Sequence, residues 1–145
     1  MDIPIYPFKG PITEYRYQFT SSSIDKNVAK VVRFSELSDD MYNLALFDQQ
    51  PDGSESSDMT ETKNKDMNIV LATVMKIVVD FLHQKPTYFV FIQGSDSKRK
   101  RLYQILMNKE HQNLKGSYLI WGGNDTQTEL FEKGKTYTFF VITKR

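Results

Sequence analysis

The stretch TYFVFIQGSDSKRKRLY, Thr87–Tyr103, decides the fold. Its first six residues form an unbroken β-rich run, which is typical of a central strand covered on both faces. Gly94 and Ser95 then mark a turn, and a helix with four consecutive cations near its start follows. Backbone N–H groups are unpaired where a helix begins. The junction is therefore a candidate site for an anion such as phosphate.

A second, more apolar helix precedes this stretch. Residues 67–82 are apolar on most sides and end before Pro86, which excludes helix at the residue before it. The segment contains Lys76 and Asp80 and is shorter than the roughly 20 apolar residues that span a bilayer. We therefore expect a buried helix and no membrane partner. Asn64 or Asp66 is expected to cap it.

Alternating or β-rich segments surround the two helices. Strands are expected at 14–20, 28–34, 42–47, 117–121, 130–132 and 135–143, and the second helix at about 97–109. The order β-β-β-α-β-α-β-β-β indicates an α+β fold. We expect a single domain over 1–145, with a curved and mainly antiparallel sheet packed around the buried central helix. The acidic segment 48–66 has no usable periodicity and is expected to be a long loop.

Composition narrows the function classes. The chain has 145 residues, which is the size of one ordinary domain. Its 19 basic and 18 acidic residues nearly cancel, so nucleic-acid binding must depend on local clustering. The chain has no cysteine, which excludes disulfides and thiolate catalysis. No metal site and no cofactor are expected, because the acidic segment lacks the spacing of a calcium loop and no phosphate-loop motif occurs. The lack of cysteine favours a cytoplasmic protein, and the N-terminal residues have neither the basic flank nor the apolar run of a signal peptide.

The candidate binding residues lie at the turn and the helix start. Gly94 leaves room for a ligand near the backbone, and Ser95 supplies donors. Arg99 and Arg101 can grip a phosphate with paired hydrogen bonds. Lys98 adds charge, and Tyr103 can stack on a base. Four further residues are candidates to flank the site: Asp48, Asn64, Asp66 and Trp121. The last of these is either a stacking platform or a core residue.

Several functions remain open at this point. The favoured one is binding of a phosphate-containing ligand, most simply RNA or DNA. A metal-independent ribonuclease of the toxin–antitoxin type is an alternative, in which Tyr103 or a histidine (His83 or His111) moves protons. A protein-interaction module or homodimer is another. One alternative argues against all of these functions. The acidic segment 48–66 could neutralise the arginines inside the protein, which would leave no site for a ligand.

The sequence also resembles a family of small bacterial proteins known as DUF6934, common in Bacteroidota. The resemblance covers most of the chain. It depends on the residues Tyr42-Asn43-Leu44, Asp48, Asn64, Asp66, Val70-Leu71-Ala72-Thr73-Val74, Gly94-Ser95, Arg99, Arg101, Leu102 and Tyr103. The usual form of the turn in the family is Gly-Ser-Thr-Pro-Ala-Arg-Thr-Arg-Leu-Tyr. The resemblance therefore implies that the arginines matter more than Lys98 and Lys100. It implies no activity.

Overall fold

The computed structural model describes residues 4–12, 15–22, 27–50, 52–56 and 66–145. The chain divides into two compact units. Unit 1 consists of residues 1–35 and 44–81, and unit 2 consists of residues 36–43 and 82–145.

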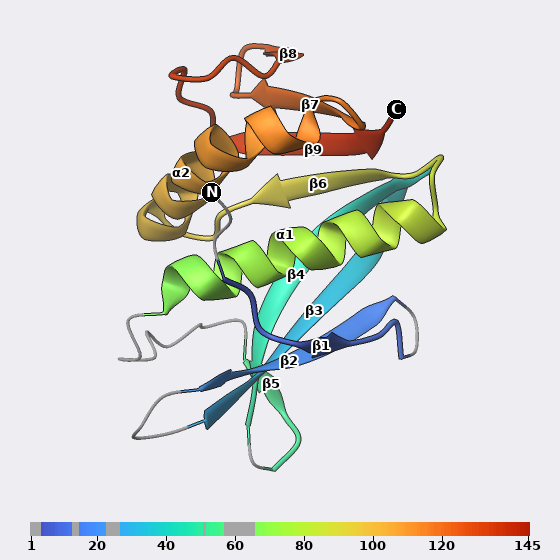
Figure 1. Cartoon of the computed structure of the whole chain (residues 1–145), viewed down its shortest axis with the longest axis vertical. Coiled ribbons are helices and arrows are strands. Elements are labelled where there is room, and N and C mark those ends of the chain that lie inside the picture. Colours follow the sequence, from blue (N-terminus) through green and yellow to red (C-terminus); the bar gives the residue numbers. More distant parts are fainter. Residues whose placement is uncertain (1–3, 13–14, 23–26, 51, 57–65) are drawn as a thin grey trace. The chain divides into compact units, whose positions relative to one another are not determined.

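The elements follow one another along the chain as Figure 1 shows. The two helices are α1 (Met67–Gln84) and α2 (Ser97–Leu114). The strands of the described residues are β1 (Phe8–Lys9), β2 (Arg16–Ser22), β3 (Asn27–Ser38), β4 (Met41–Gln49), β5 (Glu55–Ser56), β6 (Phe89–Gln93), β7 (Tyr118–Gly123), β8 (Thr128–Leu130) and β9 (Phe139–Lys144).

In unit 1, the strands β1, β2, β3 and β4 are neighbours in that order, and β5 pairs with β4. β2 is antiparallel to β1 and β3, with Phe19 opposite Phe8 on one side and Lys30 on the other. Tyr17 and Phe19 are both buried, because alternate side chains of a strand point to the same face. The alternation of aromatic and polar residues in the sequence thus predicts which face of β2 is buried.

Helix α1 is buried on most of its sides, as the sequence predicts. The Val70 N–H donates to the Asp66 carbonyl at 2.9 Å, so the helix begins directly after Asp66. Within unit 1 the Phe81 ring stacks on Phe34, with ring centres 4.0 Å apart. The Tyr17 hydroxyl donates to Asp80 Oδ2 at 2.8 Å, so a polar group of the helix is satisfied by the sheet. Asn64, the other predicted cap, lies outside the described residues.

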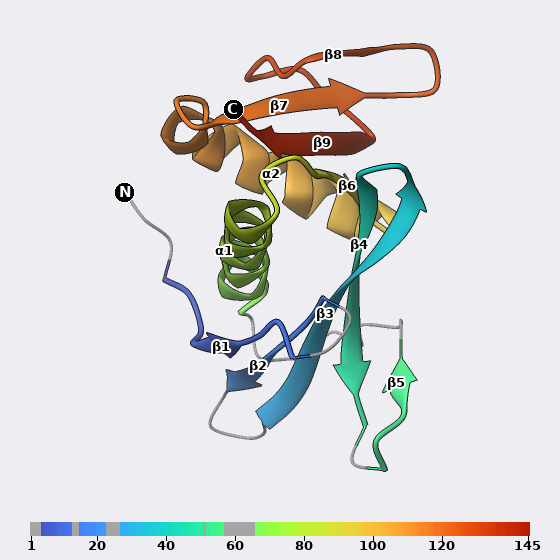
Figure 2. The same cartoon turned by 90° about the vertical axis from the view of Figure 1, so that its right-hand side faces the viewer.

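In unit 2, the start of β4 runs parallel to β6, with Met41 opposite Phe89. The remaining strands follow in the order β6, β9, β7 and β8, and all these pairs are antiparallel. Helix α2 lies along one side of β7 and β9 (Figure 2). Its His111 ring contacts Phe131, which packs on Phe140 of β9, so α2 covers the Phe140 face. The α+β class and the mainly antiparallel sheet are confirmed.

The structure corrects several details of the prediction. β7 continues through Gly122 and Gly123, where the sequence suggested that it stops. The last strand begins at Phe139 rather than at residue 135. The acidic segment also contributes to the sheet, because β4 and β5 form a hairpin whose turn is spanned by a bond from the Gln50 N–H to the Ser54 carbonyl at 2.7 Å. Residues 51 and 57–65 of that segment lie outside the described residues.

β6 also differs from its prediction. Val90 and Ile92 have no exposed surface, whereas Phe89 and Phe91 are only half-buried. When both faces of a strand are apolar, its sequence predicts that both faces are covered by other parts of the protein. Here one of those faces is open to solvent.

Candidate functional site

Gly94 lies where β6 ends and α2 begins. It is buried, and a Cβ atom placed on it would come within 2.8 Å of the Arg99 carbonyl carbon and the Lys100 Cα atom. A side chain at this position would therefore collide with the backbone of α2. The space that the sequence assigned to a ligand is occupied by the first turn of the helix. Gly94 has a structural role here.

Asp96 caps α2 and neutralises its start. Its backbone is extended, and its carboxylate accepts a hydrogen bond from the Arg99 N–H at 2.8 Å. The same carboxylate forms an ion pair with the Arg99 guanidinium. The hydrogen bond from the Arg99 backbone, together with the charge of Arg99, lowers the pKa of Asp96. An internal carboxylate thus sits where an external anion was expected, and it comes from the turn itself.

The face that α2 turns inward also differs from the prediction. The spacing of Leu102, Ile105 and Leu106 in the sequence predicts that these three residues form its buried stripe. The buried side chains are Tyr103, Leu106 and Met107, and Ile105 is 36% exposed. Arg99 lies one turn before Tyr103 on this inward face, and its side chain is 14% exposed.

Tyr103 is therefore not available for stacking on a base. Its side chain is 5% exposed, and burial raises the pKa of its hydroxyl to about 12, an effect that the nearby charge of Arg99 partly opposes. A buried ring cannot offer a face to an external ligand. A hydroxyl with this pKa is also a poor proton donor or base at neutral pH.

The other candidates of the junction face solvent. Ser95, Lys98 and Arg101 are exposed, and so is Lys100, which the sequence did not assign to the site. The three cations come from the first two turns of α2. The structure thus separates the two arginines that the sequence treated as a pair. Arg101 can reach an external ligand, whereas Arg99 is largely buried and engaged by Asp96.

Asp48 and Asp66 have partners inside unit 1. Asp48 is 2% exposed and forms an ion pair with Lys30 Nζ at 2.6 Å. Asp66 is also buried, and it accepts hydrogen bonds from the Tyr6 hydroxyl at 2.7 Å and from the Ser21 hydroxyl. These contacts give both carboxylates a role in the core of unit 1. Sequence reasoning could not find them, because Lys30, Tyr6 and Ser21 lie far from these carboxylates in the sequence.

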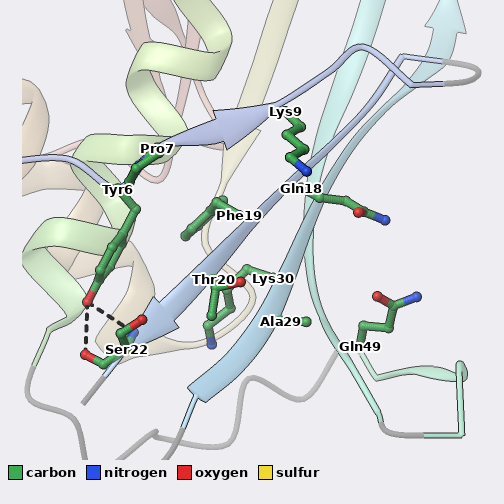
Figure 3. A pocket seen from close by; sticks show the side chains of 10 residues that line it. All are labelled: Tyr6, Pro7, Lys9, Gln18, Phe19, Thr20, Ser22, Ala29, Lys30 and Gln49. Atoms are coloured by element: carbon green, nitrogen blue, oxygen red, sulfur yellow. Dashed lines mark hydrogen bonds between the residues drawn. The ribbon is translucent and has the colours of Figure 1, made fainter. Parts of the chain in front are cut away.

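Unit 1 also contains a cavity of about 430 Å³ with a mixed polar and apolar lining. The side chains that line it come mainly from β1, β2 and β3 (Figure 3). Lys9, Gln18 and Gln49 contribute polar side chains to it, and the Tyr6 hydroxyl contacts the Ser22 backbone at 3.4 Å. The cavity offers hydrogen-bonding groups, but the arrangement does not define a reaction.

Trp121 lies in an apolar groove of about 400 Å³ in unit 2. The groove is on the sheet face opposite α2 and is lined by Met41, Phe89, Phe91, Trp121, Thr128, Phe139 and Val141. Trp121 is half-buried, and its ring centre lies 6.0 Å from that of Phe89. The sequence singled out Trp121 as either platform or core but missed the phenylalanines beside it. No local pattern could have found them, because β6 and β9 are apolar on both faces.

Charge is unevenly divided between the units. Unit 2 has eleven basic and eight acidic residues, whereas unit 1 has eight basic and ten acidic residues. The formal charge of unit 2 is therefore +3 and that of unit 1 is −2. The net charge of +1 for the whole chain hides this division. Unit 2 is the better candidate for an anionic partner.

Two further features bear on other function classes. Among the described residues, no group of three or more His, Asp or Glu side chains could hold a metal ion. Helix α1 is, in that same part of the chain, long and apolar enough to cross a membrane by length and composition, with a mean hydropathy of 1.3. The buried core helix of a soluble protein has the same properties.

The fold and the site together define an α+β protein with a basic helix start and an open aromatic sheet face. A family model described as "Family of unknown function (DUF6934)" matches residues 2–145, so the chain belongs to that family. No curated protein matches the chain, and no solved structure does.

Proposed function

We propose that this protein binds a phosphate-containing polymer, most simply RNA or DNA, through the start of α2. The observation that carries the proposal is the set of exposed cations on the first two turns of α2: Lys98, Lys100 and Arg101. They belong to the unit with the surplus of positive charge. Phosphate contacts of this kind supply affinity without requiring a particular sequence.

A polymer fits this surface better than a single phosphate group. Asp96 already occupies the helix N-terminus and engages Arg99. The remaining cations are mainly lysines, which act as mobile point charges rather than as a fixed cradle. Each contributes little to binding, and several phosphates must be bound at once for useful affinity.

The test is the binding of a short fluorescent single strand, followed by anisotropy over a range of KCl concentrations. We expect the logarithm of the affinity to fall linearly with the logarithm of the salt concentration. In the variant Lys98→Gln/Lys100→Gln/Arg101→Gln, the affinity drops by at least tenfold. The salt slope becomes shallower by about 2, at roughly 0.7 for each phosphate that the variant no longer neutralises.

A control variant with the same total charge as this triple variant tests whether the position of the cations matters. The variant Lys9→Gln/Lys76→Gln/Lys133→Gln removes three exposed cations elsewhere. It should retain most of the affinity and nearly the original salt slope. Equal losses in the two variants would mean that binding responds to net charge alone, and the proposed site would then be wrong. A wild-type protein that binds no strand at low salt contradicts the function itself.

A ribonuclease of the toxin–antitoxin type is the weaker proposal. Tyr103 is buried with a pKa of about 12. His111 lies ten residues after Arg101 on α2, or about 15 Å along the helix axis. At this separation, Arg101 and His111 cannot act on the same phosphate group. Incubation of several RNAs in EDTA should leave them intact, and reproducible cleavage that Arg101→Ala abolishes would reverse this ranking.

A further inference from the structure

The groove of unit 2 presents two pairs of aromatic rings on one sheet face. Phe89 and Trp121 have ring centres 6.0 Å apart, and Phe91 and Phe139 have theirs 5.1 Å apart. All four side chains are half-buried, so each retains contact with solvent. Leu130, which is opposite Trp121 on β8, is 59% exposed on the same face. The open face is therefore continuous across the strands.

The Phe139 ring leans across the neighbouring strand. Gly123 is its direct partner on β7, and a Cβ atom placed there would lie 2.7 Å and 2.8 Å from two carbons of this ring. Any side chain at position 123 would push the ring upright. Because the position is glycine, the tip of the ring can lie close to the backbone of β7.

The core of unit 2 does not require these rings. Val90, Ile92, Phe140 and Ile142 fill the opposite face and are at most 2% exposed. An apolar face of this extent is a cost to a soluble protein unless a ligand or partner covers it. Flat aromatic rings on an open sheet are the arrangement on which single-stranded nucleic acids stack their bases.

The spacing of the rings limits what can bind. Phe89 and Phe91 are two residues apart on β6, or about 6.6 Å at roughly 3.3 Å per residue. Stacked bases in a duplex follow one another at about 3.4 Å along each strand. Bases on both ring pairs must therefore be separated from each other, which a paired duplex does not allow.

The cations at the start of α2 form the second part of the proposed site. The groove is lined by uncharged side chains only, as far as the described residues go, so it offers nothing to phosphates. However, β6 ends at Gln93, and α2 begins only four residues later at Ser97. The basic start of α2 thus lies within about 14 Å of chain from the end of the groove. Because α2 covers the other face of the sheet, a strand that stacks its bases in the groove must pass the end of β6 before its phosphates reach these cations.

We infer that the aromatic groove is a platform for two unstacked bases, and that the ligand of this protein is a single strand. This inference rests on the proposed function, since it names the class of nucleic acid that the same unit binds. The groove selects single strands over duplexes, and the cations of α2 supply affinity that does not depend on sequence.

Trp121 reports on the groove directly, because it is the only tryptophan of the chain. We expect its fluorescence to be quenched when the wild-type protein is titrated with a short single strand. A duplex of the same sequence and inorganic phosphate should leave the emission nearly unchanged. Quenching that is equal for single strand and duplex would overturn the inference.

A double variant tests the stacking contribution. Phe91→Leu/Phe139→Leu keeps the groove apolar but removes two π-faces. The affinity for the single strand should fall at least fivefold, since stacking contributes about 1–3 kcal/mol per base. The salt slope should not change, because the cations that neutralise phosphates are all retained. The control Phe8→Leu/Phe47→Leu removes two half-buried rings of unit 1 and should leave the affinity unchanged.

The outcomes separate the two proposals. If the strand binds with the expected salt dependence but the double variant binds as well as the wild type, the groove inference is wrong and the proposed function stands. If no strand binds, both are wrong. A second copy of the chain is the other candidate occupant. Trp121 emission that changes with protein concentration but not with added strand would assign the groove to self-association. Should the double variant fail to fold, the wild-type titration of Trp121 still decides.

Discussion

Unit 1 buries a pair of charged side chains, whereas unit 2 leaves several aromatic side chains partly exposed to solvent. In unit 1, Lys30 and Asp48 form an ion pair at 2.6 Å with side chains only 1% and 2% exposed. In unit 2, Lys135 and Glu129 form an ion pair at 2.9 Å with side chains 52% and 25% exposed. The distances are similar, but the surroundings differ. Removing a charge from water costs several kcal/mol, so only the buried pair depends strongly on both partners being present.

The aromatic residues show the same contrast between the two units. Phe34 and Phe81 in unit 1 stack at 4.0 Å inside the core. Phe91 and Phe139 in unit 2 lie 5.1 Å apart on a face that remains half-open. The same residue types thus hold the core of one unit and form the open face of the other. Burial, rather than residue type, separates structural from functional candidates in this chain.

The largest effect is expected at the buried pair. Asp48→Ala leaves the Lys30 ammonium buried without its partner and should lower the free energy of unfolding by about 3–5 kcal/mol. The double variant Lys30→Met/Asp48→Leu removes both charges and should recover most of this loss. Lys135→Ala, which breaks the exposed pair, should cost at most about 1 kcal/mol. Urea unfolding measures all three. Equal costs for Asp48→Ala and Lys135→Ala would show that the contrast between the units is wrong.

A moderate effect is expected at the junction of β6 and α2. Gly94→Ala pushes a methyl group against the backbone of α2, and overpacking of this kind costs about 1–3 kcal/mol. Gly116→Ala is the matched control in the same unit, since a Cβ atom there has no neighbour within 4 Å. The midpoint of thermal unfolding should fall for the first variant and stay nearly constant for the second. If Gly94→Ala instead left stability intact and weakened strand binding, the glycine would belong to the ligand site after all.

The smallest effect is expected at the cap of α2, and it depends on pH. Asp96→Ala should cost about 1 kcal/mol at neutral pH, because the helix loses its capping carboxylate. The pKa of Asp96 is lowered in the folded state from its ordinary value of 3.8. Its ionised form therefore stabilises the fold above that pH, and this contribution is lost as the pH falls through the lowered folded value. Unfolding curves of wild type and variant should converge in acid. A constant difference down to the lowest pH would mean that Asp96 acts without its charge.

Most of the fold could be predicted from the sequence, and the reason is visible in particular segments. The strict alternation of Tyr17 and Phe19 placed β2 correctly, and the apolar residues of 67–82 identified a buried helix. The faces were harder to predict. In β6 both faces are apolar, so periodicity cannot tell the covered face from the open one. In α2, Leu102 and Ile105 suggested one stripe, but the larger Tyr103 and Met107 are the residues that the core buries.

The candidate site was predicted only in part. The exposed cations of α2 were found, but the division between Arg99 and Arg101 was not. That division depends on Asp96, a residue whose capping signal, an acidic side chain just before a helix, was present in the sequence. The groove around Trp121 depends on β6, β7 and β9 lying side by side. This pairing joins segments far apart in the chain, which no local pattern specifies.

The parallel pair of β4 and β6 has a consequence for how the chain can be divided. Residues 36–43 belong to unit 2, although they precede most of unit 1 in the sequence. No single cut can therefore release both units intact. A fragment starting at residue 82 would lack the strand that covers one edge of β6, and bared strand edges promote aggregation. An insertion that leaves Met41–Asn43 and the C-terminal strands in one chain preserves the pairing of β4 with β6. A truncation that separates these segments does not.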